Sequence, residues 1–184
     1  MALSDLTSTW RFQVTYNAEI DTEGLSSLNR PGQLSKTFNT TFGVAAEQMN
    51  NLYDGVLQIA ASGNSTIDLA GGVTNVLGEA SGTILKIKAI LVWLLNEDDD
   101  ATIVTGPTLA ASSITIGAGS SPIVNPFLAA GDGLVILSGG CFMLTAPTAD
   151  GYTITAGTAD ILRVLNNDGS NAARVRVIIG GDIS

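Results

Sequence analysis

The chain of 184 residues contains no histidine and only one cysteine, Cys141. Without histidine it lacks the usual acid-base residue at neutral pH and cannot form a Ser-His-Asp or Cys-His catalytic arrangement. A lone cysteine excludes an internal disulfide and a cysteine-based structural zinc site. Because Cys141 lies between Gly140 and Phe142, we expect it to be a buried, small hydrophobic residue. These absences predict that the chain is not an enzyme and uses no cofactor.

Charged residues are also scarce, at 14% of the chain compared with roughly 25% in an ordinary soluble domain. Seventeen acidic residues outnumber eight Lys and Arg, which gives a net charge of −9. A phosphate backbone would be repelled, so nucleic acid is excluded as a partner. With few charges to solvate it, we expect much of the surface to lie in contacts between subunits.

Long hydrophobic segments are missing as well. The longest apolar run, residues 89–95, has seven residues, whereas a membrane-spanning helix needs about 20. We therefore predict no membrane partner. The amino terminus lacks the basic start and apolar core of a signal peptide, so we expect the chain to be made and used without secretion.

Helical spacing occurs in one short stretch, where Val44, Gln48, Met49 and Leu52 recur near one face. It predicts a short helix or a turn over residues 44–54. From Gly55 onward, short apolar runs alternate with turn residues, which predicts a single β-sandwich or barrel over residues 55–184. The strands are expected at 56–61, 65–69, 83–95, 102–105, 113–116, 134–138, 141–144, 152–155, 161–165 and 174–179.

Two of these strands alternate apolar with basic residues. Lys86 and Lys88 fall on one side of the first, and Arg174 and Arg176 fall on one side of the second. Successive side chains of a strand point to opposite faces. We therefore expect each strand to have one face in solvent and one face in the core.

Residues 1–43 differ from the rest in carrying two extended, alternating pieces, at 11–16 and 33–42. Turn-forming residues at 21–24 and 29–32 join them, which predicts an extended N-terminal arm or hairpin. Because an isolated two-stranded hairpin is marginal in water, it must lie on the main domain or on a neighbour. Trp93 is expected in the core, and the candidate interface residues are the aromatic residues of the arm: Trp10, Phe12, Tyr16, Phe38 and Phe42.

Paired carboxylates are the one route to catalysis that remains, since glycoside hydrolysis needs only two acids. Asp132, Asp150 and Asp168 each precede glycine, and with Asp160 they are best explained by turn geometry, in which Asp bonds its own backbone. The densest cluster, residues 97–100, is expected to be a solvated turn. Asp98 and Asp100 are weak calcium candidates, because consecutive acids do not match the alternating ligands of a calcium loop. We predict no other metal ligands.

The carboxy-terminal part resembles structural proteins of tailed-bacteriophage virions. The resemblance covers residues 55–184 and rests on Thr-Ile-Asp-Leu-Ala-Gly at 66–71, the strand at 87–96, the Gly- and Pro-rich middle, and Val-Leu-Asn-Asn-Asp-Gly at 164–169 followed by 174–180. The similar proteins are capsid decoration (cement) proteins and head-fibre or tail-fibre modules. The resemblance implies a jelly-roll-like β-sandwich and gives no residue its role.

The resemblance also implies partners and a location. A chain of this family would form a symmetric homo-oligomer, with a trimer favoured, and would bind the major capsid protein or another virion protein. It would be made in the host cytoplasm and sit on the outer surface of the capsid, with the arm holding neighbours. Two alternatives stay open: a carbohydrate-binding β-sandwich of a phage fibre or cell surface, with Trp10 or Trp93 in its sugar-binding surface, and a glycan-cleaving enzyme.

Overall fold

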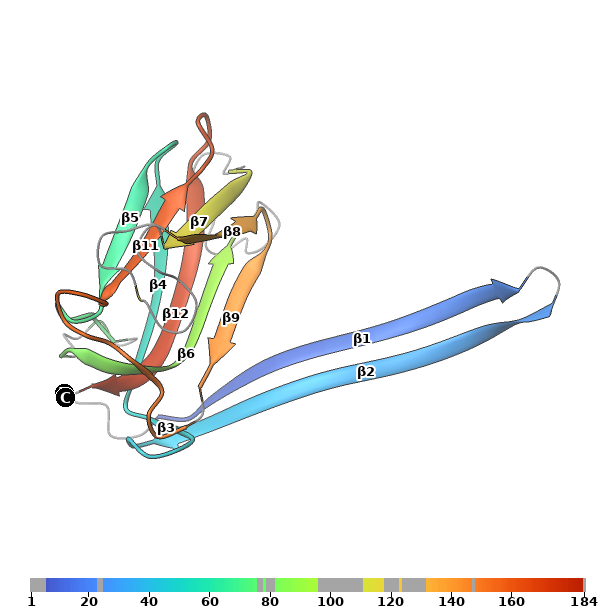
Figure 1. Ribbon diagram of the computed structural model, residues 1–184, viewed down its shortest axis with the longest axis horizontal. Helices are drawn as coiled ribbons and strands as arrows, with labels where there is room; N and C mark the ends of the chain where they lie inside the picture. Colours follow the sequence, from blue (N-terminus) through green and yellow to red (C-terminus); the bar gives the residue numbers. More distant parts are fainter. Residues whose placement is uncertain are drawn as a thin grey trace.

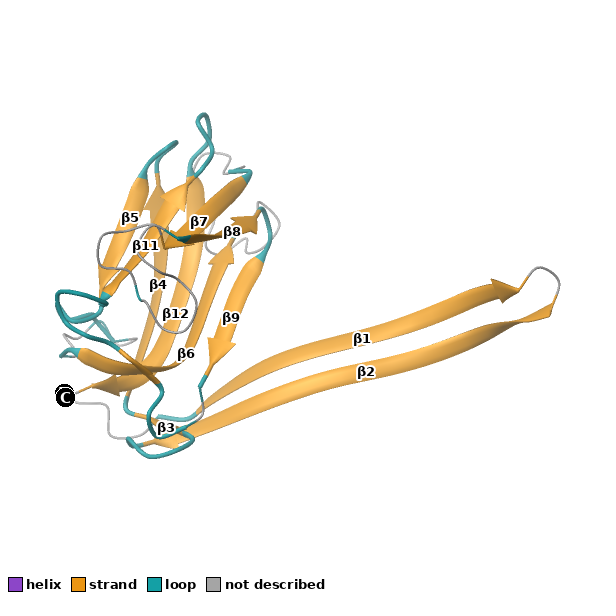
Figure 2. Cartoon of the chain, viewed as in Figure 1, coloured by secondary structure: helices purple, strands orange, loops and turns teal. Residues whose placement is uncertain are grey.

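A long two-stranded arm and a β-rich body make up the computed structural model (Figure 1). Strands joined by turns form the described part of the chain, and none of it is helical (Figure 2). The all-β class predicted from the sequence, with several antiparallel sheets, is therefore confirmed. The structure describes residues 6–22, 25–75, 78, 82–95, 111–117, 123, 132–146 and 148–183.

The arm is an antiparallel ribbon of β1 (Ser8–Thr22) and β2 (Leu25–Phe42). Its pairing runs from Ser8↔Thr40 to Thr22↔Leu25, and its strands of 15 and 18 residues far exceed the usual 5–6. The turn predicted at residues 29–32 is wrong, because the ladder continues through it and pairs Pro31 with Asn17. A strand with a free edge tolerates proline, since the missing N–H costs no ladder bond there.

The helix considered for residues 44–54 does not form. The segment contains a turn at Ala46–Glu47 and then β3 (Gln48–Met49), which pairs in parallel with the end of β2. Glu47 has a φ of 56°, a left-handed conformation that interrupts any right-handed helix. Because an isolated helix of ten residues is unstable in water, strand pairing and the burial of Met49 prevail over the helical spacing.

The body contains two antiparallel sheets. The first has the order β10-β6-β12-β4, and β9 also pairs with β6, beyond β10 along the same edge. The second has the order β5-β11-β7-β8. The strands are β4 (Asn51–Ile59), β5 (Asn64–Asp68), β6 (Ile84–Leu94), β7 (Ser113–Gly117), β8 (Gly133–Leu137), β9 (Cys141–Thr145), β10 (Tyr152–Thr153), β11 (Ile161–Asn166) and β12 (Ala173–Ile183).

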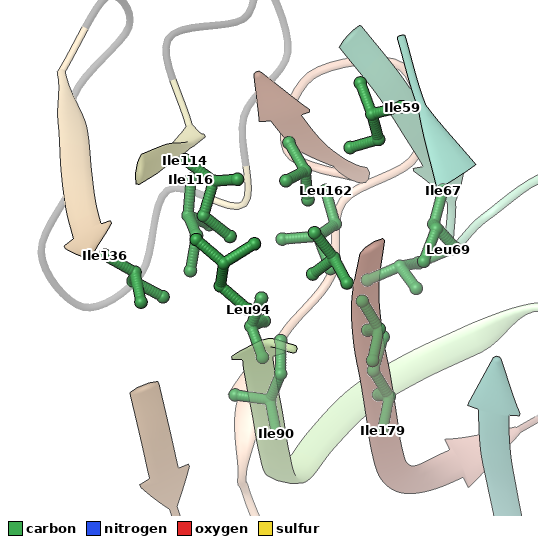
Figure 3. Close-up of a cluster of buried hydrophobic side chains, with 14 of the residues drawn as sticks. Ile59, Ile67, Leu69, Ile90, Leu94, Ile114, Ile116, Ile136, Leu162 and Ile179 are labelled. Atoms are coloured by element: carbon green, nitrogen blue, oxygen red, sulfur yellow. The ribbon is translucent and has the colours of Figure 1, made fainter. Parts of the chain in front are cut away.

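One apolar cluster joins the two sheets (Figure 3). Alternate residues of each strand point into it, as in β12, where Val175, Val177 and Ile179 are fully buried. Branched aliphatic side chains fit such pleated, buried surfaces. Both sheets contribute members, among them Ile59, Ile90, Leu94 and Ile179 from the first and Ile67, Ile114, Ile116, Ile136 and Leu162 from the second.

Two β-bulges interrupt the alternation of β6. Relative to β12, the strand has one extra residue between Ile87 and Ala89 and another between Ile84 and Lys86. Each extra residue exchanges the two faces of the strand. Lys88, the first of these residues, is completely buried. The prediction that both lysines face solvent was therefore wrong for Lys88, and it also fails for Arg174, which is buried.

Candidate functional site

The base of the arm packs on the outer face of the first sheet, the face turned away from the second sheet. Trp10 and Phe38 are paired across the arm and are both buried there, with Trp10 8% exposed. We call this group the arm root cluster. It contains Leu6, Trp10, Phe38, Met49 and Ala89, flanked by Leu52, Leu91, Met143 and Ile178.

A glycine makes the close approach of arm and sheet possible. Gly180 of β12 lies directly beneath the arm root cluster. A Cβ at this position would stand 2.6 Å from Met49 Sδ and 3.5 Å from Trp10 Cζ2. Real Cβ atoms do not approach sulfur so closely, so a larger residue would push the arm off the sheet.

Polar atoms at the arm root are also satisfied. The indole N–H of Trp10 donates to Ser8 Oγ at 2.8 Å, and Ser8 Oγ lies 2.7 Å from Thr40 Oγ1 on the opposite strand. A buried indole N–H without a partner would carry a desolvation penalty, and this bond removes it. The root therefore holds the arm to the body by apolar packing together with a fixed hydrogen-bond pattern.

Beyond the root, the arm projects away from the body (Figure 1). Phe12, one alternation after Trp10, is already 50% exposed. The paired positions Val14↔Leu34 and Ile20↔Leu28 are both apolar, and each lies an even number of residues from the Trp10↔Phe38 pair. Residues two apart in a strand share a face, so one face of the ribbon carries most of its apolar positions. Polar residues occupy the intervening positions of β1: Thr9, Arg11, Gln13, Thr15, Asn17 and Glu19.

The five residues predicted for an interface fall into three groups. Trp10 and Phe38 are buried against their own body, whereas Phe12 and Phe42 are exposed on the arm and at its base. Tyr16 pairs with Gly32 in the ladder, and its side chain lies outside the description. Contact with another chain stays a prediction for all five.

A second apolar surface lies on β8, the last strand of the second sheet. Leu134, Val135 and Leu137 are 37%, 57% and 68% exposed. We call these three residues the β8 edge. The sequence did not predict it, because an unbroken run such as Gly-Leu-Val-Ile-Leu is typical of a strand buried on both faces. Its position at the end of a sheet depends on pairing with β7, which no local pattern shows.

Cys141 lies close to the β8 edge, at the start of β9, and it is exposed. The prediction of a buried cysteine was wrong. In the register of the first sheet Cys141 pairs with Trp93, and alternation places both on the outer face. The arm root cluster covers this face at the level of Ala89 and Met143 and does not include Cys141 or Trp93. Trp93 is half-buried rather than part of the core.

A buried ion pair holds the bulged part of β6. Lys88 Nζ lies 3.5 Å from Asp182 Oδ2 on β12 and donates to the carbonyls of Thr148 and Ala149. Burial raises the pKa of the Asp182 carboxyl, and the attraction of Lys88 acts in the opposite direction. The pair joins the two strands and fastens the 148–150 segment to the sheet.

The other described carboxylates that have assigned contacts serve structural roles. Asp168 accepts backbone N–H bonds from Ser170, Asn171 and Ser112, which lower the pKa of its carboxyl well below the usual range. Asp54 forms a bidentate pair with Arg176.

Asp68 and Asp160 accept N–H groups within their own turns. Within the described part of the chain, no three His, Cys, Asp or Glu residues lie close enough together to hold a metal ion. The weak calcium candidates Asp98 and Asp100 fall outside the described residues, as does the strand predicted at 102–105.

Comparison with known proteins found no matching family model, no matching curated protein and no matching solved structure. Among the described residues, no helix is long and apolar enough to cross a membrane. Two surfaces of the described chain are candidates for contact with another molecule. One is the arm, which projects from the body beyond its root, and the other is the β8 edge with its exposed aliphatic residues.

Proposed function

We propose that the chain is a non-enzymatic structural protein of a virion, a capsid decoration (cement) protein that acts as a symmetric homo-oligomer on the outside of a phage head. The observation that carries the proposal is the arm. Strands of 15 and 18 residues extend away from the body, although a two-stranded ribbon is marginal in water by itself. Such an arm gains stability when it lies on a neighbour.

The strand order of the body supports a jelly roll as the finer fold class. Eight strands of the body pair as β4-β12-β6-β9 and β5-β11-β7-β8. This order arises when a long hairpin of four strand pairs is folded over into two four-stranded sheets. Double-sheet jelly rolls occur in viral capsid proteins and in lectins. Because one fold hosts many functions, the arm and not the fold decides between them here.

The accessible surface also favours assembly. It is 9967 Å², whereas a compact monomer of this mass exposes about 8,300 Å². The projecting arm adds to this excess. Only 14% of the residues are charged, so few charged side chains are present to solvate this additional surface. Depletion of charged residues is typical of the core of a protein–protein interface.

Size-exclusion chromatography with light scattering tests the oligomer, and co-sedimentation with heads of the virus that encodes the chain tests the decoration role. We expect a discrete oligomer, most simply a trimer, that sediments with heads in saturable amounts. A monomer that stays in the supernatant at micromolar concentrations contradicts the proposal. Heads that already carry the protein are the control, because their sites are filled.

A carbohydrate-binding β-sandwich is the second candidate, and the strand order favours it equally, since lectins also use jelly rolls. Sugar-binding surfaces commonly present an exposed aromatic ring. Trp10 is buried in the arm root cluster. Trp93 lies outside that cluster and is half-buried, so it presents only part of its side chain to solvent. A glycan array separates the two candidates: specific binding to one glycan class supports the lectin, and an empty array supports the structural role.

A further inference from the structure

We propose that the arm of one copy binds the β8 edge of a second copy of this chain. The proposal rests on the homo-oligomeric function above and names the surfaces that meet. It joins two features of the same molecule, a ribbon that has left its own body and a sheet edge with exposed aliphatic residues.

Among the residues that the structure describes, the β8 edge shows none of the devices that normally protect the end of a sheet. Exposed edge strands avoid pairing by means of charges, proline, bulges or a covering segment. β8 has the sequence Gly-Leu-Val-Ile-Leu, without charge or proline, and its pairing with β7 has no irregularity. Leu137 and Val135 are among the most exposed large hydrophobic residues of the described chain. An edge of this kind is a template for another strand.

The arm has the matching properties. Among the described strands, β1 pairs with β2 alone, so no third strand extends the ribbon on that side. One face of the ribbon has apolar positions in step with Trp10 and Phe38, and Phe12 shows that this face is uncovered as soon as the arm leaves its root. The arm points away from its own β8 (Figure 1). The recipient is therefore a second molecule.

The contact joins two different surfaces, which makes it heterologous. Heterologous contacts close into rings when the rotation permits. In a ring, every copy gives one arm and receives another. The arm from Phe12 outward to Ile20 and back to Lys36 presents a ribbon face on the order of 30 Å by 10 Å. One such contact buries on the order of 300 Å² on each copy, which is less than the roughly 800 Å² per partner of a standard interface. Each copy therefore depends on both the contact that it gives and the contact that it receives.

The first experiment places a charge on the β8 edge. Leu137→Lys and Val135→Lys, each in the full chain, are compared with Leu85→Lys, a matched control at an aliphatic residue that is 42% exposed on β6. All three substitutions are at exposed positions, so circular dichroism and thermal unfolding should match those of the unmodified chain. We expect the β8 variants to shift the oligomer towards monomer by at least tenfold in dissociation constant, and the Leu85→Lys control to leave it unchanged.

The second experiment uses Cys141, the only cysteine of the chain, which follows the β8 edge closely. A variant with Asn17→Cys on the arm and Cys141→Ser is mixed with unmodified chain, subunits are allowed to exchange, and a short bismaleimide is added. We expect a cross-linked dimer that contains one chain of each kind. The Asn17→Cys, Cys141→Ser variant alone should give no dimer, because its recipient surface has no cysteine. A dimer of this variant would show that arms pair with arms and would overturn the proposal.

The outcomes separate the two proposals. If the unmodified chain is monomeric, both the oligomeric function and this contact are wrong. A second outcome is an oligomer that is unchanged by Leu137→Lys and Val135→Lys and that gives no mixed cross-link. In that case the oligomeric function stands, but the arm does not bind the β8 edge. Loss of the oligomer in the β8 variants together with the mixed cross-link supports the contact.

Discussion

Replacing Lys88 by methionine tests the buried ion pair of the first sheet. Lys88 is completely buried, and Asp182, its partner at 3.5 Å, is 4% exposed. Removing one member of a buried pair leaves the other charge without compensation, which costs about 3–5 kcal/mol. Lys88→Met also removes the donor to the carbonyls of Thr148 and Ala149. We therefore expect a loss of about 3–5 kcal/mol of unfolding free energy at pH 8.

The loss should depend on pH, and its sign follows from Asp182. Burial already raises the pKa of this carboxyl, and Lys88 limits the rise. Without Lys88 the pKa of Asp182 rises further, so the folded variant takes up a proton more readily than the unfolded chain. The contribution of the Asp182 carboxyl to stability is fully present when the pH is below the ordinary aspartate pKa of about 3.9. It is lost as the pH rises through the raised pKa of the folded state. Lys88→Met should therefore cost less at pH 4.5 than at pH 8.

Urea unfolding followed by tryptophan fluorescence measures both effects, at one protein concentration because association also contributes to stability. The variant Lys88→Met with Asp182→Leu removes both members of the pair. It should recover at least half of the loss, since replacing a buried pair by apolar residues is often neutral. A Lys88→Met cost below 1 kcal/mol that does not change with pH would refute the reasoning.

The remaining predictions concern the arm root and the turns. Trp10→Ala should cost about 3–5 kcal/mol in urea unfolding and speed proteolysis within the arm. Gly180→Ala should cost about 1–3 kcal/mol by overpacking against the arm root cluster, whereas Gly169→Ala, where a Cβ meets only Ser62 Oγ at 3.7 Å, should have little effect. Asp168→Asn should destabilise the chain at pH 6, and the difference from the unmodified chain should shrink as pH falls towards 2, because a lowered carboxyl pKa contributes stability only above its range. Asp54→Asn, at a partly exposed pair with Arg176, should cost about 0.2–1 kcal/mol, measured by urea unfolding at low and high salt.

Strand positions in the body were predictable because turn residues separate them. The expected strands at 65–69, 113–116, 134–138 and 161–165 match β5, β7, β8 and β11 to within a residue at each end. Asp-Gly pairs and clusters of small polar residues between them disfavour continuation of a strand. All-β architecture follows from local chemistry of this kind.

Features that depend on pairing were not predictable. The bulges that bury Lys88 exist only in relation to β12, which is more than 80 residues further along the chain. The exposure of Cys141 and of the β8 edge likewise depends on which strand ends each sheet. The arm was underestimated for the same reason, since Asn29 to Gly32 has turn chemistry and is kept extended by pairing with β1. Local sequence gives these residues no partner.

The apolar run of residues 89–95 connects the body to the arm. A strand with one face in solvent alternates, and β6 does not alternate here because both of its faces meet protein. Ile90, Val92 and Leu94 enter the core between the sheets, while Ala89 and Leu91 face the arm root cluster. The bulge at Lys88 sets this phase. The outer face of the sheet thus receives the base of the arm, which makes the arm root cluster an integral part of the fold, while the rest of the arm projects away from the body (Figure 1).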